Sequence, residues 1–172
     1  MKTKDITIAS ILLALGLVLH SVTPAIFGGV KPDFLLAAMF IAIITQPRFA
    51  NTLLIACVAG ILAAMTTSFP GGQLPNIIDK LITGFFVLGY IRLLNNNLNL
   101  IKVGILGFVA TFISGFVFLG SALLIVGLPA PFSALIIAVV LPTAFANIVV
   151  STLLYKAYTM SRKQLPLKAT AK

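Results

Sequence analysis

The stretch IKVGILGFVATFISGFVFLGSALLIV, from Ile101 to Val126, decides the fold class of this chain. It contains one charged residue, Lys102, and it is longer than the about 20 residues that a helix needs to cross a hydrocarbon core of about 30 Å. Backbone donors and acceptors find no water in lipid, and the stretch lacks the period-two alternation of a barrel strand. It therefore predicts a membrane-spanning helix.

The rest of the chain has the same character. Of its 172 residues 60% are hydrophobic and 9% are charged, and the mean hydropathy is +1.16. Soluble domains average roughly 25% charged residues. Apolar runs separated by Gly, Pro, Asn and charged residues predict six spans, at about 6–22, 33–46, 52–67, 77–94, 101–126 and 132–156. The predicted fold class is an all-α integral membrane protein with six transmembrane helices, in which residues 1–172 form a single transmembrane domain.

The second span is short for a membrane crossing. Either Asp33 and Gln46 belong to it, or neighbouring helices cover it on all sides.

The positive charges predict the orientation of the spans. Six spans place both termini on one side of the membrane, and only Lys31 and Lys80 fall on the other side. Because cytoplasmic loops are rich in Lys and Arg, we expect both termini in the cytoplasm of a multi-pass protein of the cell (plasma) membrane. The residues on the terminal side are Lys2, Lys4, Arg48, Arg92, Lys102, Lys156, Arg162, Lys163, Lys168 and Lys172.

The same scatter of single cations argues against a nucleic-acid partner, because the net charge of +9 is explained by topology. The chain has three acidic residues, one histidine and one cysteine, Cys57. An intramembrane enzyme needs a set such as paired Glu and His or Ser with a nearby base, and His20 has no second histidine with which to share a metal. We therefore expect no catalytic residue, no metal site and no cofactor.

Two outer loops share Gly-Gly-x-x-Pro followed by a short polar residue: FGGVKPD at Phe27–Asp33 and PGGQLPN at Pro70–Asn76. Turn chemistry explains each copy alone, with Asp33 or Asn76 capping the next helix. Together, two capped helix N-termini entering from one side suit a ligand carboxylate. Glycines would also let the loops close over the ligand; the candidate hinges are Gly28, Gly29, Gly71 and Gly72.

One face of the fourth span is polar at its outer end. Ionisable groups inside a membrane bundle usually mark a pathway or a site, although Asp79 and Lys80 are close enough to the helix end to lie at headgroup level. The face consists of Asn76, Asp79, Lys80 and Thr83, and it is extended inward by Phe86 and Tyr90.

A weaker polar set, Thr143 and Asn147, lies on the sixth span beside an expected kink at Pro142. Asn147 could bind a ligand or could equally join helices by hydrogen bonds. His20, near the outer end of the first span, is expected to contact a loop.

Two rows of small residues would allow close helix approach. Ser10 and Ala14 form one on the first span, and the longer row on the third span is Ala56, Gly60 and Ala64. Either row could be an interface with another membrane protein or an internal contact.

The chain resembles the substrate-binding S components of energy-coupling factor (ECF) transporters and, more specifically, the bacterial tryptophan transporter family related to them. The residues that carry the resemblance are MKTKD at the start, GLVLHSVTPAIFGGVKPD at Gly16–Asp33 and TTSFPGGQLPNIIDK at Thr66–Lys80. It implies tryptophan uptake through a pocket under loops one, three and five. It also implies partners, a transmembrane coupling subunit docked on the first helix and two cytoplasmic ATPase subunits, since the chain has no P-loop of its own.

The docking motif matches only as Ser10 and Ala14, which departs from the alanine pair of S components and leaves the coupling partner open. An S component for another small nutrient or vitamin, or a stand-alone secondary amino-acid transporter, are the alternatives. A protein that only scaffolds other helices is a third class, and it would not bind a solute at all.

A tryptophan ligand would need a partner for its ammonium, its carboxylate and its ring. Asp33 or Asp79 suits the ammonium, and Lys31 or the capped helix starts suit the carboxylate. Phe27, Phe69, Phe86 or Tyr90 could stack on the indole. The remaining candidates for substrate binding are Gln73, Asn76, Thr83 and Asn147.

Overall fold

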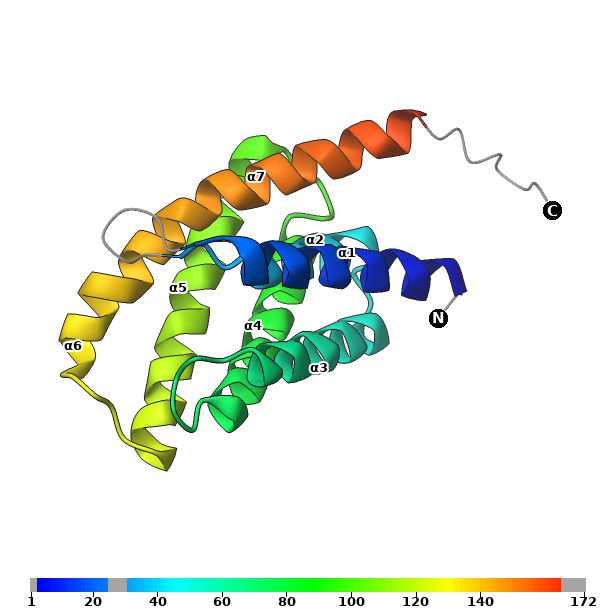
Figure 1. Ribbon diagram of the computed structural model, residues 1–172. Helices are drawn as coiled ribbons and strands as arrows, with labels where there is room; N and C mark the ends of the chain where they lie inside the picture. The colour runs from blue at the N-terminus through cyan, green and yellow to red at the C-terminus, as the bar shows by residue number, and fades with distance from the viewer. Residues whose placement is uncertain (1–2, 25–30, 165–172) are drawn as a thin grey trace.

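A computed structural model describes residues 3–24 and 31–164, and the regular elements in these ranges are all helices (Figure 1). Four of them are long and apolar enough to cross a membrane, namely α1, α4, α5 and the continuous segment Phe132–Arg162, while α2 and α3 are shorter apolar helices. The prediction of an all-α membrane protein is thus confirmed. The elements are α1 (Thr3–Val22), α2 (Phe34–Thr45), α3 (Phe49–Met65), α4 (Gln73–Leu93), α5 (Leu100–Ile125), α6 (Phe132–Leu135), the π-helix η1 (Ile136–Val140) and α7 (Leu141–Gln164).

The short helix α2 is the centre of the bundle. Every residue from Leu35 to Ile43 is buried, and α1, α3, α4, α5 and α7 all pack against it. Neighbouring helices therefore cover this short apolar helix on all sides. The second explanation of its shortness is therefore the right one, and Asp33 and Gln46 cap the helix without belonging to it.

Small residues bring the neighbouring helices close. A Cβ added to Gly84 on α4 would lie 2.8 Å from the Ala56 Cβ on α3, and one added to Gly60 would lie 3.1 Å from the Ile77 Cα. Ala56 and Gly60 are buried at this contact. The row on α3 is therefore used for internal packing.

The start of α4 differs from the prediction. The helix begins at Gln73 with Gly72 as its N-cap, so Asn76 lies in its first turn and donates from Nδ2 to the Gly72 carbonyl at 2.8 Å. Pro75 fits inside this turn because the first N–H groups of a helix have no intrahelical acceptor. The expectation that Asn76 caps the helix was wrong, whereas Asp33 caps α2 as predicted, accepting from the Leu36 N–H at 2.9 Å.

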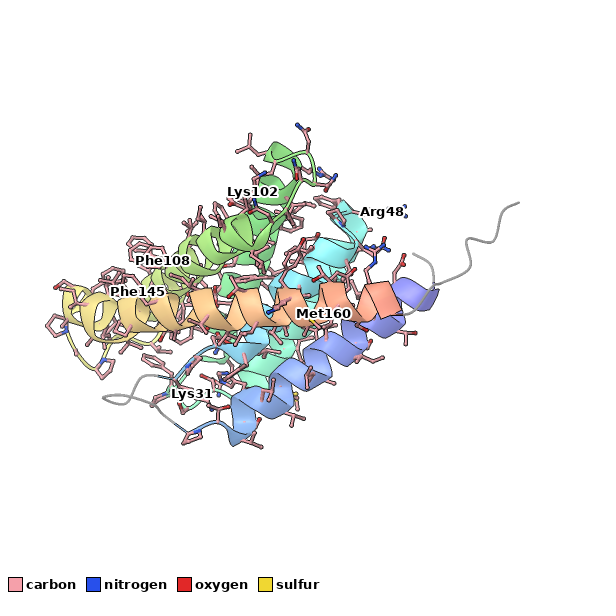
Figure 2. The ribbon with its side chains drawn as sticks, turned by 90° about the horizontal axis from the view of Figure 1, so that it is seen from above. Lys31, Arg48, Lys102, Phe108, Phe145 and Met160 are labelled. Atoms are coloured by element: carbon pink, nitrogen blue, oxygen red, sulfur yellow. The ribbon has the colours of Figure 1, made fainter. Side chains whose placement is uncertain are left out.

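The sixth predicted span is one continuous helical segment that changes winding before Pro142. In η1 the Leu141 N–H reaches back to the Ile136 carbonyl, a π-type bond, and α7 then runs to Gln164, beyond the predicted end near residue 156. Pro142 has no N–H to offer the preceding turn, so a wider turn there absorbs the missing bond. The first turn of α1 and the last turns of α7 lie at the same end of the molecule, and Lys31 lies toward the opposite end (Figures 1 and 2).

Candidate functional site

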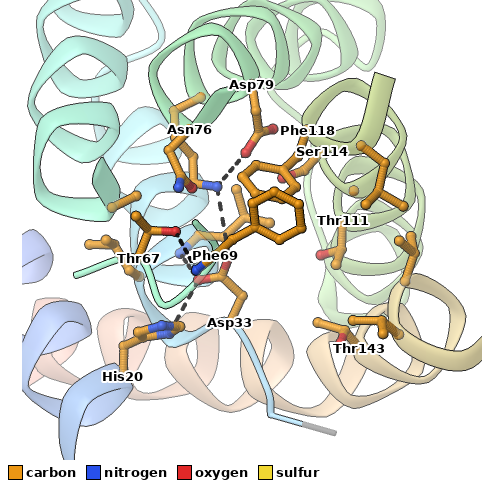
Figure 3. Close-up of a pocket in the computed structure, with 18 of the residues that line it drawn as sticks. His20, Asp33, Thr67, Phe69, Asn76, Asp79, Thr111, Ser114, Phe118 and Thr143 are labelled. Atoms are coloured by element: carbon orange, nitrogen blue, oxygen red, sulfur yellow. Dashed lines mark hydrogen bonds and ion pairs between the residues drawn. The ribbon is translucent and has the colours of Figure 1, made fainter. Parts of the chain in front are cut away.

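A cavity of about 350 Å³ lies where α1 ends and α4 begins, beneath the loop that joins α3 to α4 (Figure 3). Small-molecule sites typically measure about 300–1,000 Å³. Its walls come from every helical element, α1 to α7 and η1, so segments from both ends of the described sequence line one cavity. Its polar lining consists of His20, Asp33, Thr66, Thr67, Ser68, Asn76, Asp79, Lys80, Thr111, Ser114 and Thr143.

Charged side chains of both signs gather on one wall of the cavity. Lys80 Nζ donates to Asp79 Oδ2 at 2.5 Å and lies 3.8 Å from Asp33 Oδ2. Asp79 and Lys80 are only 1% and 3% exposed, so they face the interior of the bundle and not its surface. His20 Nδ1 lies 3.5 Å from Asp33 Oδ1, which brings α1 into the same group (Figure 3).

Hydroxyl groups complete the surroundings of Asp79. Thr83 Oγ1, one turn further along α4, donates to Asp79 Oδ1 at 3.0 Å. Ser114 on α5 lines the same cavity as this carboxylate. Burial of a charge is tolerated only when it is paired and hydrogen-bonded, and Asp79 meets both conditions.

Asp33 is fixed from behind by Asn147. The Asp33 N–H donates to Asn147 Oδ1 at 3.0 Å, and Asn147 Nδ2 donates to Thr111 Oγ1 at 2.9 Å and to the Asp33 carbonyl at 3.4 Å. One fully buried amide on α7 thereby connects the start of α2 with the middle of α5. The Asp33 carboxylate is left facing the cavity.

Two phenyl rings cover the charged group. Phe69 of the α3–α4 loop and Phe118 of α5 meet edge to face, with 5.4 Å between ring centroids and 86° between planes (Figure 3). Thr67 Oγ1 accepts from the Phe69 N–H at 3.3 Å, which shapes the loop. The cavity therefore joins an aromatic wall to a pair of carboxylates and an ammonium.

The family model described as "Tryptophan transporter TrpP" matches residues 2–163. This chain belongs to the tryptophan transporter family. Two relatives described as "Probable tryptophan transport protein" are 45% identical over 155 residues, from Bacillus subtilis (strain 168), and 47% identical over 164 residues, from Clostridium acetobutylicum. These alignments cover at least 90% of both chains in each pair.

A third relative with the same description, from Clostridium perfringens, is 40% identical over 96% of both chains. No solved structure matches the chain. The resemblance drawn from the sequence is confirmed at the level of the family, which is one of transport proteins and not of enzymes.

In this family member, four of the predicted site residues line the cavity: Asp33, Phe69, Asn76 and Asp79. Thr83 and Asn147 stand directly behind them as hydrogen-bond partners. Phe27, Gly28 and Gly29 lie outside the described residues.

Other predicted residues lie elsewhere. Gln73 is exposed at the start of α4, and Lys31, just before α2, is not part of the lining. Tyr90 lies near the far end of α4, where its hydroxyl donates to the Lys102 carbonyl at 3.0 Å, and Phe86 packs against the hydrophobic core. A helix rises about 1.5 Å per residue, so Tyr90 is four turns away from the residues of the first turn.

Two of the candidate hinge glycines, Gly71 and Gly72, lie within the described residues, and each is closely surrounded by other atoms. Gly71 has φ +72°, and a Cβ there would lie 2.5 Å from Val126 Cγ1 at the end of α5. A Cβ on Gly72 would lie 2.9 Å from Thr67 Oγ1. Both glycines allow the α3–α4 loop to pack tightly on its neighbours.

Sequence reasoning missed the contribution of α5. Thr111, Ser114 and Phe118 occur at i, i+3 and i+7 on the longest apolar run, and this spacing of two hydroxyls and a ring was the available signal. Lys80 belongs to the polar face that the sequence predicts on the fourth span but not to the predicted substrate-binding residues, and it lines the cavity.

The small-residue row on α1 lies on the opposite side of that helix from the core. Ser10 and Ala14 are exposed, while Ala9 and Leu13 are buried against the bundle. The two rows thus differ, because the row on α3 is packed inside the bundle and the pair on α1 is free to meet another surface.

Proposed function

We propose that this chain imports tryptophan across the cell membrane and binds it in the cavity between α1, α2, α4 and α5. One observation carries the proposal: a cavity of about 350 Å³ combines two carboxylates and one lysine with an aromatic wall. Family membership gives the ligand its name, because the related proteins are described as tryptophan transport proteins.

The chemistry of tryptophan fits each part of this cavity. Its ammonium needs a carboxylate, its carboxylate needs a cation, and its indole needs flat apolar surface. The charged group formed by Asp33, Asp79 and Lys80 meets the first two needs, and Phe69 with Phe118 meets the third. Hydroxyls of Thr66, Thr67 and Thr143 line the same space and are available to the indole N–H.

The membrane topology is part of the proposal. Six helices, α1 to α5 and the segment from Phe132, cross the bilayer within one transmembrane domain, with both termini in the cytoplasm. The positive-inside distribution of Lys and Arg supports this orientation. The cavity then lies near the outer face, under the loops after α1, α3 and α5, where it can receive a solute from outside the cell.

An energising partner completes the proposal. The exposed pair Ser10 and Ala14 on α1 suits close approach of a helix from a transmembrane coupling subunit, which would be served by two cytoplasmic ATPase subunits. This is the arrangement of an ECF transporter with the chain as its S component. Uptake that persists in cells without any coupling module would instead identify a stand-alone secondary transporter.

Fluorescence offers a direct test of binding, because the chain contains no Trp and only three Tyr. Purified protein in detergent is titrated with tryptophan, and the indole emission is followed. We expect a saturable change as the ring enters the apolar wall. A flat titration up to saturating ligand, with protein that is demonstrably folded, would rule out tryptophan as the substrate; competition with other amino acids and vitamins then identifies the alternative.

A matched pair of substitutions on α5 tests the location of the site. Phe118→Ala removes a cavity wall, whereas Phe116→Ala removes a ring that is 52% exposed and does not line the cavity. An aromatic contact is worth about 0.5–1.5 kcal/mol beyond its buried area, so Phe118→Ala should weaken binding about tenfold or more. Phe116→Ala should leave the dissociation constant unchanged, and equal effects of the two would place the ligand elsewhere.

A further inference from the structure

We propose that the two cavity aspartates have different roles: Asp33 receives the ammonium of the ligand, whereas Asp79 holds Lys80 in place for the ligand carboxylate. This inference rests on the proposed function, since it assigns roles within the same cavity. It also defines the substrate class, an α-amino acid in which both the ammonium and the carboxylate are free.

Both carboxylate oxygens of Asp79 are already bound by donors of the chain itself. Oδ2 accepts from Lys80 Nζ, and Oδ1 accepts from Thr83 Oγ1. The side chain is 1% exposed. A ligand ammonium that displaced Lys80 from Asp79 would leave a lysine buried without its counter-ion, a costly arrangement.

The carboxylate of Asp33 is in the opposite situation. Its Oδ1 accepts from the Leu36 N–H, but its Oδ2 has no hydrogen-bond donor within the described ranges; Lys80 Nζ, at 3.8 Å, is within ion-pair distance only. The side chain is 24% exposed, and it lines the cavity. Asp33 therefore offers a carboxylate oxygen that a ligand can reach.

The charge balance leads to the same residue. With His20 neutral, the lining carries two negative charges and one positive charge, and the tight contact between Lys80 and Asp79 cancels one of each. The excess negative charge belongs to Asp33. In a half-buried site an unbalanced carboxylate favours a cationic group from the ligand.

The other end of the ligand meets Lys80. An ammonium group has three donors, and within residues 3–24 and 31–164 only one of them is used for a hydrogen bond, the bond to Asp79. His20 Nδ1 is also buried without a hydrogen-bond partner in the described part of the chain, on the far side of Asp33. Lys80 thus has donors left for the ligand carboxylate. Its bond to Asp79 holds the Lys80 side chain away from Asp33.

The experiment compares three indole compounds that can all be followed by fluorescence: tryptophan, indole-3-propionate, which lacks the ammonium, and tryptamine, which lacks the carboxylate. For the wild-type protein we expect both analogues to bind about 10- to 100-fold more weakly than tryptophan, the range for one charge-assisted hydrogen bond. For each analogue, the measured ratio is its dissociation constant divided by that of tryptophan. The ratio for indole-3-propionate reports on the ammonium site, and the ratio for tryptamine reports on the carboxylate site.

Two variants separate the roles. Asp33→Asn keeps the helix cap, because Asn caps as well as Asp, and it should bring the indole-3-propionate ratio close to one. The double variant Asp79→Asn with Lys80→Met removes the internal ion pair as a neutral unit. It should keep the indole-3-propionate ratio of the wild type and bring the tryptamine ratio close to one.

The reverse pattern, in which the double variant loses discrimination against indole-3-propionate and Asp33→Asn retains it, would overturn the assignment. So would retention of that discrimination in both variants. If Asp33→Asn fails to fold in detergent, Asp33→Ser, which also caps a helix, replaces it with the same expected result. A wild-type protein that binds none of the three compounds would refute the proposed function itself, so the two failures are distinguishable.

Discussion

Asn147 is the residue whose replacement tests the tertiary reasoning most sharply. Its amide makes three hydrogen bonds that join α7 to the start of α2 and to α5. Hydrogen bonds between helices in membranes average about 0.6 kcal/mol and reach about 1.7 kcal/mol. Asn147→Ala should therefore lose about 2 kcal/mol of unfolding free energy from its hydrogen bonds alone, in addition to the cost of the space that it leaves.

Asn51 on α3 supplies a matched control for this measurement. It is 2% exposed and Asn147 is fully buried, so the same atoms are removed from similar surroundings, but Asn51 Nδ2 has no hydrogen-bond partner among the described residues. Equilibrium unfolding in mixed detergent micelles, followed by circular dichroism, should show Asn147→Ala to be about 2 kcal/mol less stable than Asn51→Ala. Equal losses would refute the argument that the amide of Asn147 organises the bundle.

Three further predictions concern packing and docking. Gly84→Ala brings a methyl within 2.8 Å of the Ala56 Cβ and should lower the unfolding midpoint, whereas Gly89→Ala, with nothing within 4 Å, should leave it equal or higher, because Ala favours helix by about 1 kcal/mol. Gly71→Ala should destabilise more than Gly127→Ala in the same unfolding assay; both positions have positive φ, but a Cβ at Gly71 would lie 2.5 Å from Val126 Cγ1, whereas one at Gly127 would meet no atom within 4 Å outside its chain neighbours. Ala14→Leu, on the exposed side of α1, should preserve tryptophan binding by fluorescence and reduce uptake by cells; loss of both would indicate a packing role.

Much of the fold could be read from the sequence. Apolar runs too long for soluble helices fix the membrane class, and Asp33 at the start of a run fixes one helix cap. The predicted helix boundaries were less accurate where glycine and proline allow a helix to begin early or to continue. Gly72 and Pro75 allow α4 to begin before the apolar run does, and the π-turn before Pro142 lets the last helix continue across a proline.

The candidate site was predicted in part, and there is a physical reason why some of its residues were found and others were missed. Asp79 and Asn76 were found because polar groups at helical spacing are conspicuous in an apolar segment. Ser114 and Phe118 were missed because a serine or a phenylalanine within a long apolar run is compatible with any orientation. Tyr90 was included because helical spacing identifies a face of a helix, and it does not tell how far along that face a cavity extends.

The sequence by itself determined that this chain is a helical membrane protein, that its polar groups are concentrated at one end of α4, and that it resembles tryptophan transporters. Only the tertiary structure decided which polar groups meet: Asp33 with Lys80, Asn147 with Thr111, and the α3 row inside the bundle while Ser10 and Ala14 stay outside. The physical reason is that lipid is as apolar as the protein core, so hydrophobicity does not mark the inner face of a helix. Close packing of small residues and pairing of buried polar groups select that face, and both depend on partners from distant parts of the chain.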